Sequence, residues 1–160
     1  MVRMFLQETF VITDAQFYDK GLSGTGNHND NWNTLNYFTR TDTGTIYNPS
    51  TEWARIVPMA NGSDDFTIGN GLIVEFDVVD LDVNNGQIRW IIYDGSNRQT
   101  LITTTGHYKA VITDKIYFYD DDTLIYTSSY DTSQSTIEVR FTNSVANAMM
   151  KFKDLMVYNL

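Results

Sequence analysis

Apolar and polar residues alternate with a period of two along much of this chain. In the segment 72–83, every second residue from Leu72 to Val78 is apolar, whereas Glu75 and Asp77 fall on the opposite face. This alternation predicts a strand with one buried face. Similar segments separated by polar or Gly-containing turns predict further strands at residues 9–13, 45–47, 52–58, 87–94, 100–105, 107–112, 115–119, 124–126, 136–142 and 150–158.

Turn signals indicate how these strands follow one another. Asn85-Gly86 predicts a tight hairpin that pairs segment 72–83 with segment 87–94. Asp94-Gly95 predicts a second hairpin, and Asp120–Asp122 the next turn. The only short helix candidate is 143–150, which is equally compatible with a bend between strands.

The composition supports an all-β fold. Of the 20 acidic residues, 16 are Asp and only 4 are Glu, a bias that favours turns over helices. So many short strands would leave one open sheet with a bare face and two bare edges. We therefore predict one domain, residues 1–160, built as a two-sheet antiparallel β-sandwich of jelly-roll type.

Charge and missing residue types exclude several function classes. The chain has no cysteine, so disulfides and zinc–thiolate sites are excluded. Its formal net charge of −9 would repel nucleic acid. No apolar run is long enough for membrane insertion, and residues 1–10 show no signal-peptide pattern.

The C-terminal half resembles a known superfamily. The segments FDVVDLDVNNGQIRWIIYD, HYKAVITDKIYFYDDDTLIYTS and KFKDLMVYNL are similar in hydrophobic spacing to the concanavalin A-like lectins and glucanases. The similarity covers roughly residues 70–160. It implies a carbohydrate-binding or adhesion module, of the kind found in glycosidases, surface adhesins and phage tail or baseplate proteins.

One acidic motif raises the question of catalysis. Glu75-x-Asp77-x-x-Asp80 resembles the nucleophile, neighbour and acid/base of laminarinase- and lichenase-like glucanases. However, Asp80 is shorter than the family's Glu, and without a bulge it would lie on the face opposite Glu75. We therefore predict no catalytic residue. A small glycoside hydrolase using Glu75 is the alternative. The histidines, His28 and His107, lie in a loop and at a strand start without a nucleophile elbow.

Sugar binding would depend on aromatic rings that stack on pyranose faces, with polar side chains on the hydroxyls. Trp90 is in phase with apolar neighbours and is predicted to be buried. If the Asn85-Gly86 hairpin pairs its strands, four residues share one platform. The predicted ligand-binding residues are that platform and two further tryptophans: Glu75, Asp77, Arg89 and Tyr93, with Trp32 and Trp53.

Calcium is the one cofactor that the sequence suggests. The resemblance implies a structural calcium held by an acid early in the last strand, here Asp154, together with N-terminal residues such as Glu8 or Asp14.

The combined expectation is a non-catalytic module that binds a polysaccharide or a cell-surface glycan. We expect it outside the cell, on a cell surface or on a virion, as part of a larger multi-domain or multimeric assembly that gains affinity by repetition. The remaining alternative is a structural β-sandwich that mediates protein–protein assembly.

Overall fold

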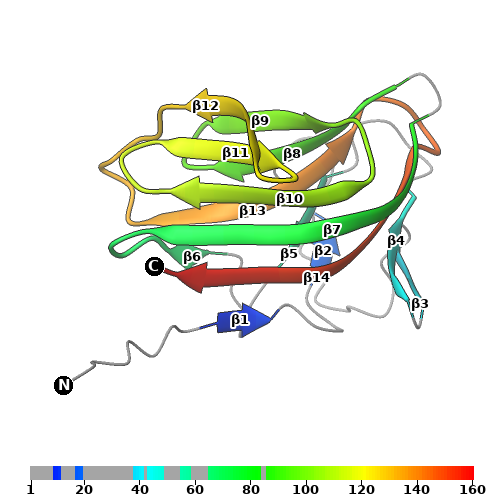
Figure 1. Cartoon of the computed structure of the whole chain (residues 1–160), viewed down its shortest axis with the longest axis horizontal. Helices are drawn as coiled ribbons and strands as arrows, with labels where there is room; N and C mark the ends of the chain where they lie inside the picture. The colour runs from blue at the N-terminus through cyan, green and yellow to red at the C-terminus, as the bar shows by residue number, and fades with distance from the viewer. Residues whose placement is uncertain are drawn as a thin grey trace.

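The computed structural model describes residues 9–11, 17–19, 38–41, 43–48, 55–58, 65–83 and 86–160. These residues form two antiparallel sheets that face each other, as Figure 1 shows. The sandwich predicted from the alternation is confirmed. The described residues contain no helix, and therefore none that could cross a membrane.

The first sheet, called sheet A, holds eight strands. In spatial order they are β12 (Thr123–Ser128), β11 (Ile116–Asp120), β10 (Gly106–Ile112), β7 (Leu72–Asp82), β14 (Met149–Asn159), β4 (Gly44–Tyr47) and β3 (Phe38–Thr41), with β1 (Thr9–Val11) also paired to β14. The second, sheet B, holds β2 (Phe17–Asp19), β5 (Arg55–Pro58), β13 (Thr136–Asn143), β8 (Ile88–Tyr93) and β9 (Asn97–Ile102), with β6 (Phe66–Thr67) also paired to β13.

Aromatic side chains from both sheets fill the space between them. Phe76 of β7 lies at the centre, with its ring centroid 4.9 Å from that of Trp90 and 5.3 Å from that of Phe141, both in sheet B. Trp90 is fully buried, as its phase predicted. Edge-to-face ring pairs of this kind add to the stabilisation that burial itself provides.

The first predicted hairpin is wrong. β7 pairs with β10 and β14, whereas β8 pairs with β13 and β9, so β7 and β8 belong to different sheets and the chain changes sheet between them. Gly86 is needed here for close approach, since a Cβ would lie 2.3 Å from Val145. The segment is held from the other side: Ser144 N–H donates to the Gln87 carbonyl, and Gln87 N–H donates to Ser144 Oγ.

The other turns agree with the sequence. Gly95 has a positive φ in the turn between β8 and β9. Asp121 and Asp122, with φ of 45° and 67°, form the two-residue turn between β11 and β12. Residues 144–147 form the bend that was the alternative to a short helix.

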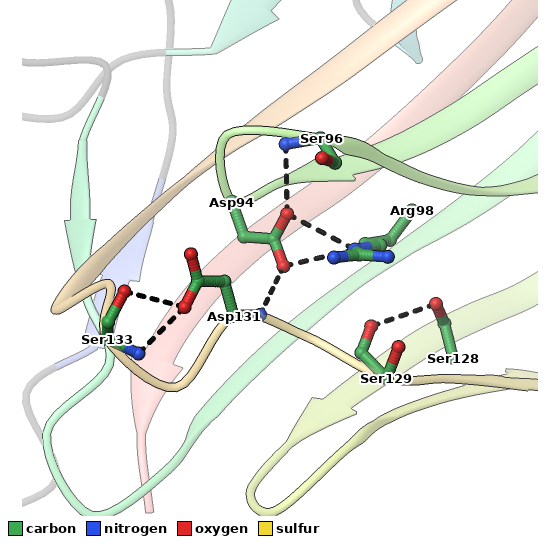
Figure 2. Close-up of polar contacts among 7 residues, drawn as sticks. All are labelled: Asp94, Ser96, Arg98, Ser128, Ser129, Asp131 and Ser133. Atoms are coloured by element: carbon green, nitrogen blue, oxygen red, sulfur yellow. Dashed lines mark hydrogen bonds and ion pairs between the residues drawn. The ribbon is translucent and has the colours of Figure 1, made fainter.

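A buried carboxylate joins the β8–β9 turn to the β12–β13 connection (Figure 2). Asp94, whose side chain has no solvent exposure, accepts hydrogen bonds from Ser96 N–H, Asp131 N–H and Arg98 Nε. Asp131 in turn accepts from the backbone N–H and hydroxyl of Ser133. This network holds two loops that are 37 positions apart in the chain.

Candidate functional site

The outer face of sheet A carries a cluster of ionisable side chains. β7 presents Glu75 and Asp77 on this face, because Val74, Phe76 and Val78 point into the core. On β10, His107 pairs in register with Asp77, and Lys109 with Glu75. Strand register therefore brings together side chains from two separate segments.

His107 lies between the two carboxylates. Its Nδ1 is 2.7 Å from Asp77 Oδ1, and its Nε2 is 3.4 Å from Glu75 Oε2. A neutral imidazole would turn one lone pair toward a carboxylate, so both contacts are favourable only when both ring nitrogens carry a proton. Partial burial lowers the pKa of His107, but the hydrogen bond and charge of Asp77, with Glu75, outweigh it and raise the pKa overall.

The backbone of His107 is held by the β11–β12 turn. His107 N–H donates to Asp121 Oδ1 at 2.9 Å, and Asp121 N–H donates to the His107 carbonyl at 2.8 Å. Gly106 leaves room for this carboxylate, since a Cβ there would lie 2.8 Å from Asp121 Oδ2. The turn that the sequence predicted thus also positions the histidine.

Tyrosines flank the cluster on both sides. Tyr158 of β14 donates its hydroxyl to Glu75, and burial together with the Glu75 charge raises the pKa of this phenol. On the other side, the Lys109 ammonium lies 5.2 Å from the ring centroid of Tyr119 on β11 and 3.7 Å from Asp122 Oδ1. The face therefore combines fixed charges with half-buried aromatic rings.

The predicted four-residue platform does not form. Glu75 and Asp77 lie on the outer face of sheet A, but Arg89 and Tyr93 lie on the outer face of sheet B, on the opposite side of the sandwich. The reason is the sheet crossing described above, which separates the two strands that the hairpin would have paired. The Tyr93 ring is moreover covered by the Arg140 guanidinium, 3.4 Å from its centroid.

The acidic motif of the glucanase alternative also differs from expectation. Asp80 pairs with Lys151, and Val78 with Phe152, so Val79 forms a bulge that returns Asp80 to the outer face. Asp80 nevertheless lies five positions from Glu75, about 15 Å along the strand. Retaining hydrolysis needs carboxyl groups about 5–5.5 Å apart. The bulge therefore does not bring Asp80 close enough to Glu75 to form the carboxyl pair of a retaining glycosidase.

The remaining predicted site residues have separate outcomes. Trp32, Trp53, Glu8 and Asp14 lie outside the described residues, so the tryptophan and calcium predictions stay predictions. Asp154 lies in a bulge of β14 with φ 53°, and its side chain is 65% exposed. Among the residues described, no group of three His, Asp or Glu side chains could hold a metal ion.

Sequence reasoning missed the central histidine. The sequence alone places His107 only at the start of a strand, without a catalytic motif around it. Its alternation with Lys109 indicates a shared face, but nothing local indicates which strand lies beside β10. The partner Asp77 is 30 positions away.

Comparison with known proteins identifies the fold. No family model and no curated protein sequence matches the chain. The alginate lyase from Corynebacterium sp. superimposes with a TM-score of 0.54 at 16% identity, over 78% of this chain and 81% of that one. A protein of unknown function with a galectin-like fold from Bacillus subtilis gives 0.52 at 11% identity, over 76% and 86%. The marine PL7 alginate lyase AlyA1 from Zobellia galactanivorans gives 0.50 at 12% identity, over 77% and 80%.

At these identities the likeness shows the fold alone. The neighbours are jelly-roll sandwiches, so the fold that the resemblance implied is confirmed.

Proposed function

We propose that the outer face of sheet A binds a neutral polysaccharide or glycan without cleaving it. The observation that carries this proposal is the His107 ring held between Asp77 and Glu75 on adjacent strands. Carboxylates accept hydrogen bonds from sugar hydroxyls, imidazolium and ammonium groups donate to them, and tyrosine rings stack on the apolar face of a pyranose. A jelly-roll fold shared with two alginate lyases supports a carbohydrate partner.

Rigid strands favour recognition at this face. Glu75, Asp77 and His107 project from paired strands, and their side chains are only 16%, 34% and 38% exposed. Groups that are already fixed lose little conformational entropy when a ligand binds. We extend the proposal to an extracellular, cell-surface or virion location, where a weak module gains affinity by repetition.

Two features argue against cleavage. The acid/base candidate Asp80 lies about 15 Å along the strand from Glu75, whereas retaining hydrolysis needs about 5–5.5 Å, and the His107 ring contacts Glu75 itself. A lyase acting on alginate, a polymer of uronic acids, must also bind carboxylates of its substrate. Two protein carboxylates at the centre of the face would repel such a polymer. A neutral glycan meets no such penalty.

Affinity electrophoresis through gels that contain neutral or acidic polysaccharides tests the proposal. We expect retardation by at least one neutral polymer and a loss of about tenfold or more in affinity for Asp77→Asn, which removes a charged acceptor. Arg89→Gln is the matched control, because it changes an ionisable residue on the opposite sheet. Equal weakening by both variants, or no retardation by any neutral polymer, would contradict the proposal.

Incubation of the same polymers with the chain tests inertness separately. We expect no increase in reducing ends and no ultraviolet absorbance from an unsaturated product. Product formation that is lost in Glu75→Gln would establish the glycoside hydrolase alternative instead.

A further inference from the structure

A row of uncharged side chains crosses the outer face of sheet A beside the ionisable cluster. In register across β11, β10, β7 and β14, the row consists of Tyr117, Val111, Ile73 and Tyr158. All four side chains point outward, because the preceding residue of each strand is buried in the core. All four are half-buried. This uncharged row therefore crosses four adjacent strands and ends in a tyrosine on each side.

The next row along the same strands carries charge. It contains Lys109 and Glu75, which pair in register. Lys109 leans away from the uncharged row, since its ammonium lies 3.7 Å from Asp122 Oδ1, in the turn at the other end of β11. Glu75 accepts the hydroxyl of Tyr158. An apolar strip thus lies directly beside a strip that can donate and accept hydrogen bonds.

The two tyrosines at the ends of the uncharged row are held in place. Tyr117 Oη donates to Asp114 Oδ1 at 3.0 Å, and the Tyr158 hydroxyl donates to Glu75. A ring whose hydroxyl is already bound loses little conformational freedom when a ligand stacks on it. Three strand spacings separate β11 from β14, which places the two tyrosines about 14 Å apart.

We propose that the glycan bound at this face is an extended β-1,4-linked chain that lies across the strands, along the uncharged row; this inference rests on the proposed function. Such a chain has apolar ring faces and hydroxyl groups at its edges, so it matches an apolar row beside a polar one. One sugar unit of the chain advances by nearly the distance between neighbouring strands, about 4.8 Å. Four consecutive sugars therefore contact β11, β10, β7 and β14 in turn, with one hydroxyl edge toward Lys109 and Glu75.

Shape and charge disfavour other polymers on this row. An α-1,4-linked chain curves, because its glycosidic oxygen is axial, so consecutive sugars cannot follow a straight row across four strands. An acidic polymer would bring its carboxylates close to Glu75, while Lys109 is already engaged by Asp122. The row therefore favours a chain that is both neutral and extended.

Titration calorimetry of the full chain with β-1,4-linked gluco-, manno- and xylo-oligosaccharides of two, four and six units tests the length of the site. In at least one series we expect affinity to rise at least about tenfold from two to four units, and to change little from four to six. Malto-oligosaccharides of the same lengths are the α-1,4-linked control. Equal affinity for two and four units, or equally tight binding of malto-oligosaccharides, would overturn the inference.

Tyrosine variants test the position of the chain. Tyr117→Ala should weaken binding of the four-unit ligand about three- to tenfold, the size of one ring-stacking contact, whereas Tyr117→Phe keeps the ring and should bind as the wild type does. Tyr126→Ala is the matched control, because Tyr126 of β12 is exposed but stacks on buried Phe118 and so lies on the other side of the sheet. Thermal melts verify that the variants fold. Equal weakening by the two alanine variants, or none by Tyr117→Ala, would contradict the assigned row.

These results separate the inference from the proposed function. A neutral polymer that binds in an Asp77-dependent way, without any preference for extended β-1,4-linked chains, overturns the inference and leaves the proposed function intact. If no neutral polymer binds, the proposed function fails and the inference fails with it.

Discussion

Replacing Asp94 with alanine removes a carboxylate on which three donors converge. Ser96 N–H lies 3.0 Å from Oδ1, Asp131 N–H lies 2.7 Å from Oδ2, and Arg98 Nε lies 3.2 and 3.1 Å from the two oxygens. The Asp94 side chain is fully buried, whereas Arg98 remains 26% exposed. The variant therefore leaves two backbone donors without an acceptor, while the guanidinium can turn toward water.

The expected destabilisation follows from these contacts. Each of these part-buried backbone donors loses a hydrogen bond to a charged acceptor, which is worth about 1.5–3 kcal/mol. The exposed Arg98 adds less than about 1 kcal/mol, because solvent screens the pair. We expect a loss of about 3–4 kcal/mol, in the range for breaking one side of a buried ion pair. For a domain of this size, that loss lowers the melting temperature by roughly 6–16 °C.

Urea unfolding of the wild type and of Asp94→Ala, followed by circular dichroism, measures this loss. Asp114→Ala is the matched control, since Asp114 also accepts side-chain hydrogen bonds but is exposed. It should cost less than about 1 kcal/mol. If Asp94→Ala cost no more than Asp114→Ala, the carboxylate would not hold the two loops together.

Three other predictions concern the outer face of sheet A and calcium. Because His107 has a raised pKa in the folded chain, the folded state binds more protons than the unfolded state. The stability from this contact is present below about pH 6.5 and falls as the pH rises through the folded pKa. Urea unfolding across this window should show a flatter profile for His107→Asn. Gly106→Ala should lower stability by about 1–3 kcal/mol in the same assay, because φ is 146° and the new Cβ meets a carboxylate at 2.8 Å. If Asp154 binds calcium with Glu8 or Asp14, adding calcium to an EDTA-treated sample should raise the melting temperature of the wild type but not of Asp154→Asn.

Local periodicity is sufficient to predict most of the strands. The alternation in segment 72–83 reflects one buried and one wet face, a property that depends only on the residues themselves. β7 therefore appears where the sequence predicts it, and so does β13, with Phe141 inward. The buried position of Trp90 follows for the same reason.

Local periodicity does not predict which strands pair, because pairing depends on residues far away in the chain. Asn85-Gly86 is as suitable for a crossing between sheets as for a hairpin. The chain crosses between sheets because β7 pairs with β14 instead of with β8, in a long register that runs from Met149 to Asn159. The expected grouping of Arg89 and Tyr93 with Glu75 and Asp77 on one face failed at this step. Asp94 is a second case in which a distant partner could not be predicted. Turn chemistry predicts that Asp94 lies in a turn, but it does not predict which loop buries its side chain.

The same topology links binding to the integrity of the whole sandwich. The cluster takes Glu75 and Asp77 from β7, His107 from β10 and Tyr158 from β14, strands that are far apart in the sequence. No hairpin of this chain contains all four residues, so the site exists only when the sheet has closed around β7. Partial unfolding that released β14 would remove Tyr158 from the cluster and expose the core around Phe76 in one step. Glycan affinity and global stability should therefore fall together under denaturant, which a site built on a single loop would not require.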